Sequence, residues 1–114
     1  MTDQIKASLV LYSGRPDPHW TIQQPEAIAH IQQSLRNLSE APPPKWPGLG
    51  WRGFMLEANQ HSLLPGIVRV FEGTICITED NGRRCYADRD HLEEWLRSEA
   101  VHNGLGPQLP QKPN

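Results

Sequence analysis

Short apolar runs bounded by glycine, proline and polar turn residues predict a set of β-strands. Runs of about four to eight residues, rich in branched and aromatic side chains, are typical of strands that line a core. Asn81-Gly82 favours a tight hairpin and therefore antiparallel pairing of the segments on either side of it. Gly73 lies between two runs and indicates a bulge or a sharp bend. The predicted strands cover residues 6–12, 54–58, 67–71, 74–78 and 83–87.

A different spacing, in which apolar residues recur every three or four positions, predicts a first helix from Pro25 to about Leu38. Pro25 is suited to the first helical position, and Glu26 beside it complements the positive end of the helix dipole. His30 falls on the polar side of this helix, where we expect a histidine that is exposed to solvent.

A second helix is predicted after the last strand. Asp90 and Glu93 have the spacing of a capping box, and Asp88 is an alternative capping residue. Glu93 belongs to the face that we expect to contact water, whereas Trp95 belongs to the buried stripe. Asn103-Gly104 is typical of the end of a helix.

The order strand, helix, strands, helix predicts an α+β fold. We expect a mainly antiparallel sheet of about four to five strands, with two helices packed on one face. A single domain is predicted over residues 1–104, including a loop rich in proline and glycine at 39–53. Residues 105–114 are predicted to form a flexible tail.

The composition narrows the class of protein. The chain has 114 residues and a formal net charge of −2, which disfavours a strongly basic nucleic-acid-binding domain. Its mean hydropathy is −0.60, and it has no apolar run of about 18 residues that would cross a membrane. The first residues lack the pattern of a secretory signal, so we expect a cytosolic protein.

The two cysteines are expected to be reduced thiols in such a compartment. If Asn81-Gly82 forms a two-residue loop, Cys76 faces Ala87. A four-residue loop over 79–82 would instead place Cys76 opposite Cys85. The preference of Asn-Gly for two-residue loops favours the first register, and therefore two separate thiols.

Motifs for cofactors and metals are weak. Residues 48–53 match G-x-G-x-x-G, but a dinucleotide site needs a strand before this motif and a helix after it. Here a proline run precedes the motif and a predicted strand follows it, so a turn that needs backbone freedom is favoured. None of the five histidines has the spacing of a metal-binding pair. We therefore expect no cofactor and no metal.

Three residues with chemically useful side chains lie just after the first predicted strand. Arg15, Asp17 and His19 fall within five residues, an arrangement suited to binding an anion or to acid–base chemistry. Asp17 has a structural alternative, since it can pair with Arg15 or close a turn. No nucleophile is visibly paired with the cluster.

Tryptophans are concentrated in the loops. Trp20, Trp46 and Trp51 lie in or beside segments rich in proline and glycine, and Arg52 follows directly. Tryptophan and arginine are favoured at the centres of protein interfaces, which points to a recognition surface. The alternative is that the rings fold back to cover a small core.

Two segments carry a resemblance to a family. Ser13–Trp20 and Gly50–Phe54 resemble a group of small uncharacterised proteins that pair an S-G-R-P-x-P-x-W segment with a later G-x-R-G-F segment. The resemblance extends over about residues 7–101 and implies no activity. It implies that Arg15, Trp20, Arg52 and Gly53 form one feature, with the end of the first strand beside the start of the second.

These observations predict a non-enzymatic accessory protein that binds another protein or a peptide through its loops. The alternative is a small-molecule (anion) binder or enzyme that uses Arg15, Asp17 and His19. The predicted binding residues are Arg15, Asp17, His19, Trp20, Trp46, Trp51 and Arg52.

Overall fold

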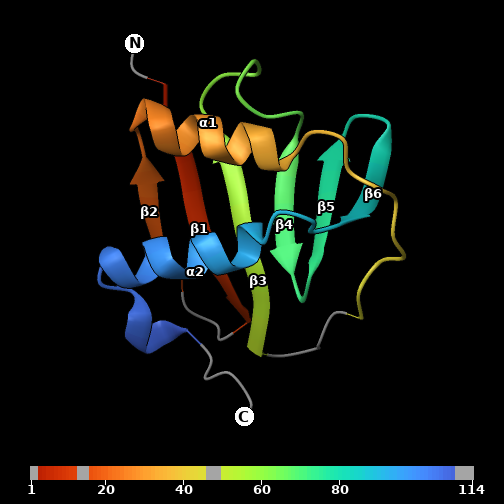
Figure 1. Ribbon diagram of the computed structural model, residues 1–114. Helices are drawn as coiled ribbons and strands as arrows, with labels where there is room; N and C mark the ends of the chain where they lie inside the picture. Colours follow the sequence, from red (N-terminus) through yellow and green to blue (C-terminus); the bar gives the residue numbers. More distant parts are fainter. Residues whose placement is uncertain (1–2, 13–15, 46–49, 110–114) are drawn as a thin grey trace.

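The computed structural model describes residues 3–12, 16–45 and 50–109, without the side chains of residues 12 and 50–52. Its elements are β1 (Ile5–Tyr12), β2 (His19–Ile22), α1 (Pro25–Ser34), β3 (Gly50–Ala58), β4 (Ile67–Phe71), β5 (Thr74–Glu79), β6 (Gly82–Ala87), α2 (Leu92–His102) and the 3-10 helix η1 (Gly106–Gln108). The six strands form one antiparallel sheet in the order β2-β1-β3-β4-β5-β6. Both α-helices lie across the same face of this sheet (Figure 1).

The predicted α+β class and the placement of two helices on one face are confirmed, but the number of strands is wrong. The sheet has six strands, where four to five were expected. The additional strand is β2, which pairs with β1 so that Trp20 lies opposite Ala7. The sequence pattern hides it because it has four residues and follows Pro16 and Pro18, which mark a loop.

One face of the sheet supplies most of the core. Side chains alternate between the two faces of a strand, so Ile5, Ala7 and Leu9 of β1 all lie on the same face. These three residues are fully buried. The helices complete the core with Ile28 and Ile31 from α1 and with Leu92, Leu96 and Ala100 from α2.

The first helix is shorter than predicted. α1 ends at Ser34, whereas the apolar stripe predicts an end near Leu38. The backbone N–H groups of Leu35 and Arg36 donate to carbonyls three residues earlier, and Asn37 has a positive φ of 55°. Leu35 and Leu38 still pack against the core, so the apolar spacing continues after the helical backbone has ended.

Asp88, rather than Asp90, caps the second helix. The two carboxylate oxygens of Asp88 accept hydrogen bonds from the backbone N–H groups of Leu92 and Glu93, at 2.8 and 2.9 Å. His91, directly before Leu92, has a left-handed conformation with φ 56°. The expected Asp90–Glu93 capping box is therefore wrong, and the alternative cap is the one observed.

Glu93 is half-buried and joins this helix to the sheet, although the sequence pattern placed it on the face that contacts water. Its carboxylate accepts hydrogen bonds from the backbone N–H groups of Glu72 and Gly73, at 3.2 and 2.9 Å. These two residues have positive φ values of 48° and 77° and connect β4 to β5. Gly73 therefore marks a sharp bend, one of the two outcomes that its position predicts.

We expect Asp88→Ala to lower the free energy of unfolding by about 2 kcal/mol, because it removes two hydrogen bonds to a charged acceptor at the start of α2. Urea denaturation followed by circular dichroism measures the change. Asp90→Ala is the matched control, since Asp90 is exposed, and it should cost less than about 0.5 kcal/mol. Equal costs for the two variants would contradict the assignment of the cap.

The two cysteines are bonded to each other. Cys76 of β5 lies directly opposite Cys85 of β6, and their sulfur atoms form a disulfide. Glu79 pairs with Gly82, so the loop residues are Asp80 and Asn81 rather than Asn81 and Gly82. The expected register and the expected pair of thiols are both wrong, and the pairing of Cys76 with Cys85 is the alternative that the sequence left open.

We expect removal of this disulfide to destabilise the fold by roughly 2–3 kcal/mol, the chain-entropy value for a loop of about ten residues. The double variant Cys76→Ala/Cys85→Ala, compared with the oxidised protein in urea, measures this cost. Thiol titration of denatured protein purified without reductant should detect no free thiol before reduction. Two reactive thiols at that stage would contradict the disulfide.

The segment after α1 returns to the sheet at its far edge. The backbone N–H of Ala87 donates to the carbonyl of Ser39 at 2.9 Å, and that of Ala41 donates to the carbonyl of Cys85 at 3.0 Å. Glu40 lies between these contacts and forms an isolated bridge with Tyr86. Part of the predicted 39–53 loop therefore pairs with the outer side of β6, and β3 begins within it at Gly50.

Gly53 allows a β-bulge between β1 and β3. Leu9 lies opposite Phe54 and Leu11 lies opposite Trp51, so β3 has one residue more than β1 in this interval. Gly53 has a φ of 87°, and a Cβ atom there would collide with the carbonyl oxygen of Val70. Residues 50–53 lie in a strand, so the described part of the G-x-G-x-x-G match does not lead into a helix.

We expect Gly53→Ala to lower the free energy of unfolding by about 3 kcal/mol, because it combines a left-handed backbone with a steric clash in the sheet. Gly73→Ala is the control: its φ is also positive, but nothing lies within 4 Å of the added Cβ. That variant should cost only about 1 kcal/mol in the same urea titration. Similar losses would show that the close approach to Val70 is unimportant.

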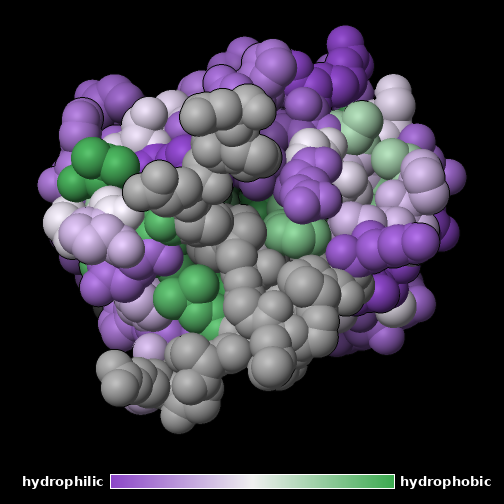
Figure 2. Space-filling model, turned by 90° about the horizontal axis from the view of Figure 1, so that it is seen from below, coloured by the Kyte–Doolittle hydropathy of each residue, from purple (hydrophilic) through white to green (hydrophobic). Residues whose placement is uncertain are grey.

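The surface is largely polar. Hydrophilic residues cover much of the face shown in Figure 2, and apolar residues are visible in separate places among them. Within the described ranges, no helix has the length and apolar character needed to cross a membrane. Leu105 and Leu109, at the start of the expected tail, flank η1 and pack against the core, while residues 110–114 lie outside the described part.

Candidate functional site

A pocket lies at the β2 edge of the sheet, where three elements converge. The start of α1 and the end of α2 both lie beside β2 (Figure 1). The cavity among them has a volume of about 450 Å³, and we call it the edge pocket. Its chemically informative lining residues are Trp20 of β2, Glu26 and His30 of α1, and Trp95, Glu99 and Asn103 in or directly after α2.

Trp20 closes the sheet side of the edge pocket. Its side chain is 6% exposed and packs edge to face on Phe54, with ring centroids 6.4 Å apart and an interplanar angle of 89°. The indole Nε1 atom is buried and has no hydrogen-bond partner among the described residues. An unsatisfied buried donor costs about 1–3 kcal/mol, so an acceptor supplied by a ligand would relieve that cost.

His30 and Trp95 form the wall between the two helices. Their rings are stacked with centroids 4.8 Å apart and planes tilted by 33°. The Nε2 atom of His30 is buried and has no partner in the described part of the chain. The expectation of a solvent-exposed histidine is therefore wrong: His30 is half-buried because Trp95 reaches it from α2.

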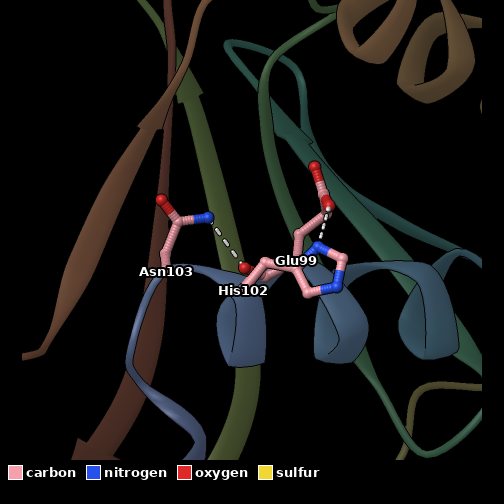
Figure 3. Close-up of polar contacts among 3 residues, drawn as sticks. All are labelled: Glu99, His102 and Asn103. Atoms are coloured by element: carbon pink, nitrogen blue, oxygen red, sulfur yellow. Dashed lines mark hydrogen bonds and ion pairs between the residues drawn. The ribbon is translucent and has the colours of Figure 1, made fainter.

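The charged groups of the edge pocket are acidic. Glu26 and Glu99 are among its lining residues, and none of the described residues that line it is a lysine or an arginine. Figure 3 shows the Glu99 carboxylate beside the ring of His102, with 3.9 Å between Oε2 and Nδ1. The His102 side chain is 77% exposed, so this pair contributes little even when the ring is protonated.

The end of α2 is held in place by Asn103. Its side-chain amide donates a hydrogen bond to the backbone carbonyl of Glu99 at 2.7 Å (Figure 3). The backbone N–H of Asn103 also donates to the carbonyls of Glu99 and Ala100, at 3.1 Å each. Gly104 follows with a φ of 83°, which confirms the predicted helix end.

A second cavity is larger but chemically less informative. It has a volume of about 580 Å³ and lies between the loop before β4 and the β5–β6 turn. Residues such as Glu57, His61 and Asp80 line it. None of the buried, unpaired side-chain nitrogens found in the described residues belongs to its lining. We therefore take the edge pocket as the candidate site.

The structure describes only part of the predicted cluster after the first strand, namely Asp17 and His19. The carboxylate of Asp17 accepts a hydrogen bond from the backbone N–H of Leu11 at 3.0 Å and so closes the connection between β1 and β2. His19 is exposed, with Nδ1 3.4 Å from the carbonyl oxygen of Asp17. Because side chains alternate along β2, His19 points to the opposite face of the sheet from Trp20.

The other predicted binding residues are not placed as side chains. Arg15 and Trp46 lie outside the described residues, and Trp51 and Arg52 are described as backbone alone. Leu11 lies opposite Trp51, so the end of β1 is beside the start of β3, as the shared motif implies. A joint feature of the two guanidinium groups and Trp20 stays a prediction.

Most of the edge pocket was missed from the sequence, although a signal was present. Glu26 and His30 are four residues apart, as are Trp95, Glu99 and Asn103. Each set therefore lies along one face of its helix. What the spacing does not reveal is that the two faces meet at the same edge of the sheet.

Comparison of the chain with models of known protein families, with curated proteins and with solved structures gives no match. The family resemblance of the 13–20 and 50–54 segments therefore stays a prediction. Among the residues placed by the structure, no group of three or more histidine, cysteine, aspartate or glutamate side chains could hold a metal ion.

Proposed function

We propose that this chain is a non-enzymatic binding protein that anchors a segment of another protein in the edge pocket. The observation that carries this proposal is that Trp20 and His30, whose ring nitrogens Nε1 and Nε2 are buried without a hydrogen-bond partner among the described residues, both line the same cavity. Buried polar atoms are normally paired, so a ligand that reaches these two nitrogens on entering the pocket would complete their hydrogen bonds.

The side chains around these nitrogens support recognition rather than catalysis. Two tryptophans and a histidine provide large, rigid contact surfaces, as interface hot spots do. In the predicted catalytic cluster, Asp17 already accepts a backbone hydrogen bond and His19 lies on the other face of the sheet from the edge pocket. The pocket therefore shares Trp20 with the predicted binding residues but is built mainly from the helices.

A second candidate function is the binding of a free small molecule. The cavity volume of about 450 Å³ falls within the range of roughly 300–1,000 Å³ typical of such sites. This alternative differs from the predicted anion site, because the described lining of the edge pocket has two carboxylates and, apart from histidine, no basic side chain. A protein segment is favoured because the pocket lies beside the terminal strand of the sheet.

Nuclear magnetic resonance of the ¹⁵N-labelled protein tests the proposal. The indole N–H signal of Trp20, assigned with Trp20→Phe, should shift when a mixture of short blocked peptides is added, because a bound acceptor changes its environment. Trp95→Ala and His30→Ala should weaken this response about tenfold, since each removes a wall of the pocket.

Gln33→Ala on the exposed face of α1 is the matched control and should leave the response unchanged. Thermal denaturation of each variant separates loss of binding from loss of folding. A Trp20 signal that no peptide mixture shifts, while the protein remains folded, would refute the proposed function.

A further inference from the structure

Resting on the proposed function, we propose that the edge pocket recognises a basic side chain, lysine or arginine, of the bound segment. Among the residues that the structure describes, the pocket joins two carboxylates, two indoles and a histidine and has no lysine or arginine. A cation is the group whose charge matches the carboxylates and whose attraction to aromatic faces matches the rings, and Trp20 Nε1 has no hydrogen-bond partner among the described residues.

The charge of the pocket selects the sign of the ligand. Glu26 and Glu99 come from different helices, so a group between α1 and α2 meets negative charge from both sides. The carbonyl end of α2 beside Glu99 favours a cation and the amino end of α1 beside Glu26 favours an anion, so the two dipoles oppose each other and the carboxylates decide the sign. An acidic segment would be repelled by the same groups.

The rings provide attraction beyond charge. A cation near the face of a tryptophan gains about 0.5–1 kcal/mol at an exposed site and about 2 kcal/mol where water is excluded. Trp95 is half-buried beside His30, and Trp20 is almost fully buried. The long apolar stem of a lysine or arginine would contact these rings while its charged end remains near the carboxylates.

The unpaired nitrogens favour a peptide over a simple amine. An ammonium or guanidinium group offers donors alone, and the N–H of Trp20 is itself a donor. The indole therefore needs an acceptor elsewhere in the ligand, and the backbone carbonyl of the basic residue supplies one. His30 Nε2 accepts or donates according to its tautomer, so it can bind either part.

The proposal is tested with blocked single residues as probes. N-acetyl-lysine methylamide and N-acetyl-arginine methylamide are compared with the norleucine analogue, which keeps the apolar stem without the charge, and with the glutamate analogue. Titration of the Trp20 indole signal gives each dissociation constant. We expect both basic probes to bind about tenfold more tightly than norleucine, and glutamate to bind most weakly.

A pair of charge variants on one helix locates the effect. Glu99→Gln should weaken binding of the lysine probe about fivefold and leave binding of the norleucine probe unchanged, because it removes charge with little change in shape. Glu94→Gln is the control: Glu94 is exposed on the same helix and does not line the pocket, so neither probe should change.

Each alternative result has a distinct meaning. Equal binding of lysine and norleucine, or tighter binding of glutamate, would overturn the inference and leave the proposed function standing. Equal effects of Glu99→Gln and Glu94→Gln would also overturn it, because the attraction would then be unspecific. If no probe shifts the Trp20 signal at millimolar concentration, both the inference and the function that it rests on fail.

Discussion

The structure depends on covering one apolar face of a six-stranded sheet with two short helices. α1 has 10 residues and α2 has 11, so each is only about 15–17 Å long. They bury the middle of the face, where Leu9, Phe54 and Val68 are fully enclosed. Beside β2 the coverage is left incomplete, and the edge pocket lies there. The candidate site is therefore a consequence of how little helix is available to cover the sheet.

Much of the fold could be predicted from local patterns. The strand at 67–71 has the predicted bounds, and the end of the second helix at Asn103 is also correct, because both signals lie within a few neighbouring residues. β2 was missed because four residues between prolines carry too little periodicity to be distinguished from a loop. The pairing of Cys76 with Cys85 depends on where the two-residue loop lies, because moving the loop by one residue changes the partner of Cys76 from Ala87 to Cys85. The Asn-Gly preference favoured the wrong loop.

The candidate site was harder to predict than the fold, for a physical reason. A helical pattern shows which residues share a face but not what packs against that face. His30 was assigned to solvent because its own helix places it among polar neighbours, yet its environment is set by Trp95 from a helix more than sixty residues away along the chain. Trp20 was among the predicted binding residues, but its buried, unpaired nitrogen becomes visible only in three dimensions.

The pairing of residues 39–41 with β6 makes the two borders of the sheet unequal. On that side the outward-facing backbone groups of Cys85 and Ala87 are already engaged, whereas β2 is the last strand at the opposite border. Exposed strand borders are where separate chains join into continuous sheets. Residues 39–41 therefore protect part of the β6 border against such joining, and no described strand protects β2 in the same way.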